Sequence, residues 1–121
     1  MAPIDEPHAF DDDLTTEHAH GMLDFYAKTL IELGYRSGRY EDIEGHIGAC
    51  RFETPKYDTL NHALWMCDQS RIFLRGGRLA KAYRWIGTIQ GILFMNGVFS
   101  IVELKEHNRL ELPAVKPRGQ R

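Results

Sequence analysis

Apolar residues recur at helical spacing from about Thr16 onward, three and four positions apart. These positions are Ala19, Met22, Leu23, Tyr26, Leu30 and Leu33. Gly34 follows them, and glycine often ends a helix because it adopts the left-handed conformation readily. The pattern predicts a helix over about 16–33 with one buried face.

Two further helices are predicted on either side of the pair Gly76 and Gly77. The first runs from about Asp58, a good N-cap residue, to Arg75, and has Trp65 and Ile72 beside its apolar face. The second spans about 78–96 and is followed by a glycine at position 97. Because the connection is so short, these two helices should form an antiparallel hairpin.

A fourth, short helix is predicted to begin at Ile101. Ser100 and Glu103 have the spacing of a capping box, and Phe99 and Leu104 have that of a hydrophobic staple. This helix should end before the proline at position 113.

Together these elements predict an all-α fold, a small four-helix bundle built on the central helical hairpin. The helical domain should span 15–112, between a flexible acidic tail at 1–14 and a flexible basic tail at 113–121. Between the first two helices we expect a connection with at most one short helix, around 41–51. The expected core residues are Leu23, Tyr26, Leu30, Leu64, Ile86, Ile89 and Leu93.

The charge balance excludes two classes of function. A net charge of -2 is too small for a protein that coats nucleic acid and too small for a DNA mimic. The N-terminus lacks the basic and apolar stretch of a secretory signal, so we expect a cytoplasmic protein with two free thiols. The uncharged run 85–102 could be a membrane span, but its polar residues favour a buried core helix.

Basic residues cluster around the predicted Gly-Gly turn, and they form the main candidate site. Helical spacing lets several of them share one surface, which could bind a partner or an anion. The start of the third helix would add free backbone N–H groups. The alternative is a solvated helix face. The candidate contacts are Arg71, Arg75, Arg78, Lys81, Arg84 and Trp85.

Histidine and cysteine residues were considered as metal ligands or as a catalytic pair. His46 and Cys50 are four residues apart, as two ligands on one helical face would be, but His62 and Cys67 are five apart. No third group is evident that would hold a base in place. We therefore expect no metal site, no cofactor, no catalytic residue and no enzymatic activity.

Gly87 and Gly91 form a G-x-x-x-G pair in the third predicted helix. Such a pair usually allows tight packing inside a bundle, but it can also serve self-association. This helix is apolar around more of its circumference than one small core needs, and Phe94 and Met95 add to the excess. The sequence therefore predicts a homodimer that uses these four residues.

The segments Arg84-Trp85-Ile86-Gly87-Thr88-Ile89-Gln90-Gly91 and Ser100-Ile101-Val102-Glu103-Leu104 resemble a group of short helical proteins encoded by tailed phages and prophages. The similarity covers about 58–110. It implies a setting in a bacterial host cell but no catalytic residues. The expected function is a non-enzymatic accessory protein that binds and modulates a host or phage protein. The alternative is binding of a nucleotide or of nucleic-acid phosphate through the basic turn.

Overall fold

The computed structural model describes residues 15–40 and 56–109, and these fold into four α-helices without a strand. The helices are α2 (Thr16–Glu32), α5 (Lys56–Arg75), α6 (Leu79–Met95) and α7 (Ile101–His107). The predicted all-α bundle is therefore confirmed. The predicted tails at 1–14 and 113–121 and the predicted short helix around 41–51 lie outside the described residues.

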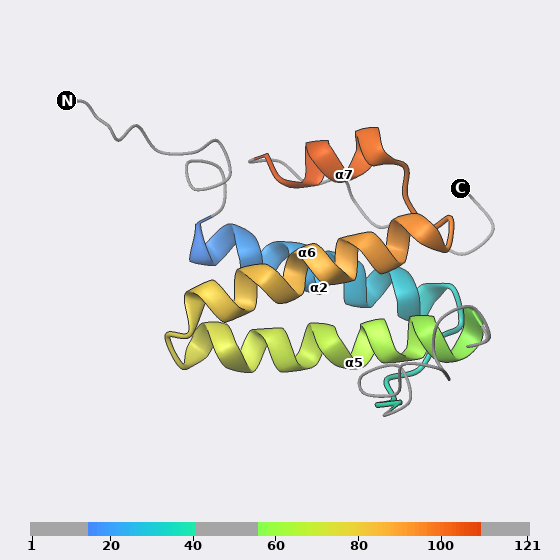
Figure 1. The fold of residues 1–121 in the computed structure, drawn as a ribbon, viewed down its shortest axis with the longest axis horizontal. Coiled ribbons are helices and arrows are strands. Elements are labelled where there is room, and N and C mark those ends of the chain that lie inside the picture. The colour runs from blue at the N-terminus through green and yellow to red at the C-terminus, as the bar shows by residue number, and fades with distance from the viewer. Residues whose placement is uncertain (1–14, 41–55, 110–121) are drawn as a thin grey trace.

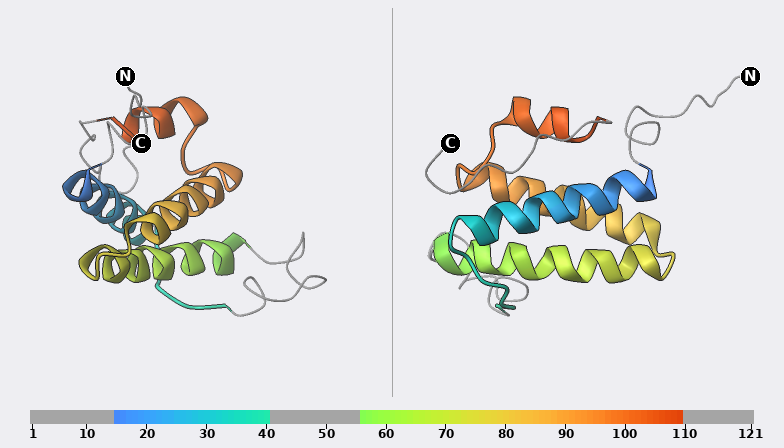
Figure 2. Two further views of the ribbon diagram at one scale, coloured as in Figure 1. Left: turned by 60° about the vertical axis from the view of Figure 1, so that its left-hand side comes forward. Right: turned by 180° about the vertical axis from the view of Figure 1, so that it is seen from behind.

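The four helices are arranged around α2 and α6. Figures 1 and 2 show α5 along one side of this pair and the short α7 across the opposite side. α5 packs against both α6 and α2, while α7 packs against α6. The bundle is therefore built on the α5–α6 hairpin, as predicted, because α2 packs on α5 and α7 packs on α6.

Local sequence sets the ends of α2. The Thr15 hydroxyl oxygen accepts a hydrogen bond from the His18 backbone N–H at 3.0 Å, which caps the first turn. At the other end Gly34 has a φ of 102°, a conformation that costs glycine little. The predicted boundaries are therefore accurate to about one residue.

The hairpin turn also follows the prediction, with one correction. Gly77 adopts a φ of 80°, and the Arg78 N–H donates to the Phe73 carbonyl at 2.9 Å, which closes the end of α5. However, α5 begins at Lys56, so Asp58 lies in its first turn and is not its N-cap. An acidic residue there still favours the helix because it faces the positive end of the helix dipole.

The capping box of α7 is present, and both residues of the predicted hydrophobic staple are buried. The Ser100 hydroxyl accepts from the Glu103 N–H at 3.1 Å, and the Glu103 carboxylate accepts from the Ser100 N–H at 2.8 Å. Phe99 and Leu104 are both buried. The capping box thus starts this short helix, and the two buried side chains hold it against the bundle.

The core contains all seven side chains that the sequence predicted for it. The buried members are Leu23, Tyr26, Leu30, Leu64, Ile86, Ile89 and Leu93. Ile72, by contrast, was expected beside the core and is 52% exposed. Among the described residues, no helix combines the length and the apolar character needed to cross a membrane.

Candidate interaction surface

Arg71 does not lie with the other basic residues, which corrects its predicted place in the binding surface. It points from α5 toward α2, where its guanidinium contacts Asp24 at 2.8 Å and Asp68 at 2.8 Å. It also donates to the Leu23 carbonyl at 3.3 Å, and only 17% of its side chain is exposed. Arg71 therefore ties two helices together inside the chain.

Three other basic side chains lie against aromatic rings on the α5–α6 hairpin. The Lys81 ammonium is 4.6 Å from the centroid of Phe73 and 5.9 Å from that of Trp85. Arg78 lies 5.4 Å from the Phe73 ring, and Arg39 lies 5.3 Å from the Trp65 ring. Cation–π attraction holds charged groups in such positions. We call these residues the cation–aromatic seam: Arg39, Trp65, Phe73, Arg78, Lys81 and Trp85.

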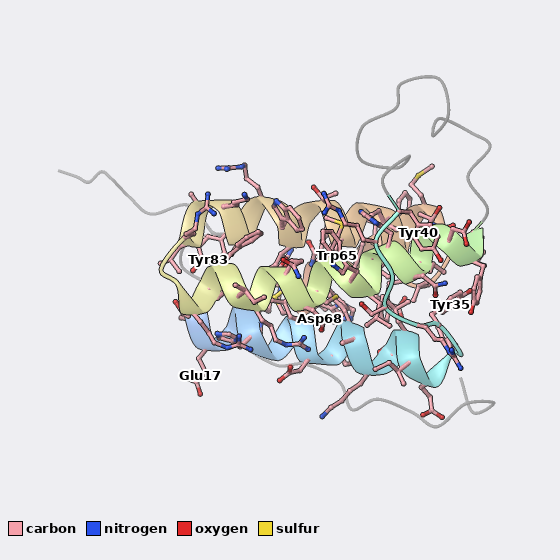
Figure 3. All side chains as sticks on the ribbon, turned by 90° about the horizontal axis from the view of Figure 1, so that it is seen from below. Glu17, Tyr35, Tyr40, Trp65, Asp68 and Tyr83 are labelled. Atoms are coloured by element: carbon pink, nitrogen blue, oxygen red, sulfur yellow. The ribbon has the colours of Figure 1, made fainter. Side chains whose placement is uncertain are left out.

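The rings of the seam contact one another along the hairpin. Phe73 and Trp85 meet edge to face at 5.0 Å, and Trp65 lies 6.0 Å from Trp85. All three rings are partly buried, so packing against the hydrophobic core holds them in place. Figure 3 shows Trp65 on the side of α5 that faces α6, and Asp68 on the side that faces α2.

The segment after α2 carries Arg39 to the seam. It crosses the outside of α5 between Tyr35 and Tyr40 (Figure 3). Two buried polar residues of α5 bind its backbone: Asn61 accepts from the Arg36 N–H at 2.8 Å, and His62 Nδ1 accepts from the Tyr40 N–H at 3.0 Å. His62 thus has a structural use, in addition to its ring contact with Trp65 at 5.1 Å.

Two cations of the seam and two cations beside it lie without a carboxylate partner within residues 15–40 and 56–109. Arg78 and Lys81 form no ion pair with any residue that the structure describes, and neither do the exposed Arg75 and Arg84. The first turn of α6 contains no acidic residue, and its N-cap, Arg78, makes no side-chain capping bond. The hairpin therefore presents cations and free N–H groups on its surface.

Cys67 is enclosed in the core and is poorly suited to nucleophilic chemistry. Burial raises the pKa of its thiol from 9.0 to about 12, so the thiol stays protonated at neutral pH. His46 and Cys50 lie outside the described residues. Within residues 15–40 and 56–109, no three His, Cys, Asp or Glu side chains converge as metal ligands would.

Gly87 and Gly91 are exposed on α6, so they serve no tight packing against the part of the chain that the structure describes. A Cβ atom built on either glycine would meet nothing within 4 Å. Phe94 and Met95 are also exposed, Met95 by 78%. The outer side of α6 is therefore flat at the two glycines and apolar toward its C-terminal end.

Of the six seam residues, the sequence singled out three as candidate contacts, namely Arg78, Lys81 and Trp85, and did not indicate the other three. Trp65, Phe73 and Arg39 join the seam only because α5, α6 and the segment after α2 meet there. Compared with family models, curated proteins and solved structures, the chain gives no match.

Proposed function

We propose that this chain is a non-enzymatic accessory protein of the phage type, which acts in the bacterial cytoplasm by binding a host or phage protein. The cation–aromatic seam would bind an acidic surface of that partner. The observation that carries the proposal is the position of Lys81, which lies over Phe73 and Trp85 and has no carboxylate partner among the described residues.

The composition of the seam supports binding to a protein. Tryptophan, tyrosine and arginine supply most of the binding energy in protein interfaces, and the seam contains two tryptophans and two arginines. Its rings are packed on the core and its cations rest on those rings, so little conformational entropy would be lost on binding. The charges of Arg78 and Lys81, which form no ion pair with a described residue, would also speed association with an acidic partner.

The exposed cations beside the seam would enlarge the positively charged surface. Arg75 ends α5 and Arg84 lies one turn along α6 from Lys81. Both would add long-range attraction that salt weakens. The partner-binding residues proposed here are therefore Arg39, Arg75, Arg78, Lys81, Arg84 and Trp85, without Arg71.

The test is capture of a partner by the tagged chain, compared with a charge-reversed variant. Arg78→Glu combined with Lys81→Glu should abolish retention, because both changes place carboxylates at the proposed contact. Retention of the same protein by this variant would show that the seam is not the binding surface.

A second candidate function is binding of phosphate groups in a nucleotide or nucleic acid. The start of α6 favours it, because Arg78 leaves the first N–H groups of the helix without a side-chain cap. Binding of a single-stranded oligonucleotide should then weaken steeply with salt. Absence of binding at low salt, or binding that salt does not change, would contradict this candidate.

We also propose that two copies associate through the outer face of α6. The open space at Gly87 and Gly91 would let a second helix approach closely, with Phe94 and Met95 covering the rest of the contact.

A further inference from the structure

A groove of about 460 Å³ runs between α2 and α5, away from the seam, and the segment after α2 closes one end of it. Figure 3 shows the two helices side by side, with Asp68 between them and Tyr35 toward one end. The volume lies within the range of small-molecule sites. The lining residues are Asp24, Ala27, Lys28, Ile31, Tyr35, Arg36, Ser37, Leu64, Asp68 and Arg71.

One part of this groove holds two carboxylates that share a single guanidinium. Arg71 binds Asp24 from α2 and Asp68 from α5, and Asp68 also accepts a hydrogen bond from the Ser37 hydroxyl at 3.4 Å. These two carboxylates therefore have partners in place. Arg71 offsets one of their two charges, so this end of the groove keeps a charge of -1. With Lys28 and Arg36 the lining has three cations and two carboxylates, so the groove as a whole has a charge of +1.

The rest of the groove joins an apolar floor to unpaired positive charge. Ala27 and Leu64 are buried in the floor, whereas Ile31 beside them is 60% exposed, which is costly for so large an apolar side chain. Lys28 and Arg36 line the same groove, are exposed, and form no ion pair with a described residue. The surface thus offers apolar contact beside cations.

We propose that this groove binds a small amphipathic carboxylate. The apolar body of the ligand lies on Ala27, Ile31 and Leu64, and its carboxylate pairs with Lys28 and Arg36. Arginine and lysine both bind carboxylates through charge-assisted hydrogen bonds. The site is independent of the seam, so it can be tested whether or not the seam binds a protein.

The experiment measures binding of decanoate and of decylammonium to the full chain by calorimetry, below the concentrations at which they form micelles. Decanoate should bind saturably at one site, at least tenfold more tightly than decylammonium. Lys28→Glu combined with Arg36→Glu should remove that preference. Ile31→Asp should weaken decanoate binding at least tenfold.

Two variants serve as matched controls. Ile72→Asp changes an equally exposed isoleucine that does not line the groove, and Lys105→Glu combined with Arg109→Glu changes two exposed cations elsewhere. Both should bind decanoate as the parent does. The proposal is overturned if decanoate fails to saturate, if both amphiphiles bind equally, or if the control variants lose as much affinity as the groove variants.

Discussion

The Tyr26 hydroxyl of α2 lies 2.9 Å from Nδ1 of His107 in α7, a residue 81 positions later in the chain. Gln90 of α6 donates to the same hydroxyl at 2.9 Å. Because Tyr26 is buried and accepts from Gln90, the acceptor for its own hydrogen among the described residues is His107 Nδ1. This hydroxyl therefore joins three helices and selects the His107 tautomer that has a free Nδ1 lone pair.

Tyr26→Phe should destabilise the fold by about 1–3 kcal/mol, because the substitution removes the buried hydroxyl that bonds His107 Nδ1 and one N–H of Gln90. Urea unfolding measures the change. Tyr57→Phe, at an exposed position, should leave the free energy of unfolding close to the parent value. Equal stability of parent and Tyr26→Phe would contradict this role.

The stabilities of the parent and of Tyr26→Phe should also diverge at alkaline pH. Burial raises the pKa of Tyr26 above its ordinary value of 10.0, and the Gln90 hydrogen bond opposes that rise in part. The unfolded chain therefore releases the phenol proton first, so stability is lost as pH rises above 10. The parent should lose stability there faster than Tyr26→Phe. A difference that stays constant from pH 8 to 11 would contradict the prediction.

Cys67 should resist thiol reagents in the folded chain. The pKa of this thiol is raised to about 12, chiefly by burial; Arg71 opposes the rise, and the Asp68 and Asp24 carboxylates add to it. In a Cys50→Ser chain, which leaves one thiol, reaction with an aromatic disulfide reagent at pH 8 should be at least about 100-fold slower than in urea. A fast reaction under native conditions would show that the core opens at this position.

Arg71→Met should cost about 1–2 kcal/mol of stability. The substitution keeps the length of the side chain but removes its charge-assisted hydrogen bonds, while Asp24 and Asp68 remain about half exposed and can be hydrated. The loss should shrink in 1 M salt, because salt screens the ion pairs of the parent. Arg75→Met is the control and should change little. A larger loss for Arg75 than for Arg71 would contradict this account.

The sequence predicts elements that depend on neighbouring residues, and it fails where distant segments meet. Ser100 and Glu103 are three positions apart, so the start of α7 can be inferred from them alone. Arg71 and Asp24 are 47 positions apart, and no local pattern indicates that they pair. Arg71 was therefore placed with the surface cations although it bridges two helices.

The difference between local spacing and tertiary packing also explains which seam residues the sequence indicates and which it does not. Lys81 and Trp85 were identified because they follow the glycine turn on a helix, and their spacing is local. Phe73 was missed because only the packing of α5 against α6 brings its ring beneath Lys81. Ile72, its neighbour, was expected beside the core and is exposed, since helical periodicity locates a face to within about one residue.

Substitution of the outward-facing glycines should separate folding from association. Gly87→Ala and Gly91→Ala should each stabilise the monomer by about 0.5–1 kcal/mol, because alanine favours a helix and the new methyl group meets open space. Gly87→Gln should shift a dimer toward monomer in sedimentation experiments, because the larger side chain blocks close approach. A monomeric parent, or a dimer that Gly87→Gln does not weaken, would contradict self-association through α6.

The most direct test of the central claim is capture from a nuclease-treated bacterial lysate at low salt, with three versions of the tagged chain in parallel. The parent and the control variant Lys105→Glu/Arg109→Glu should retain the same protein in stoichiometric amount, and 0.5 M salt should release it. Arg78→Glu/Lys81→Glu should retain none, although circular dichroism shows it folded. Equal retention by all three versions, or no protein retained by the parent, would contradict the proposal that the cation–aromatic seam binds an acidic partner.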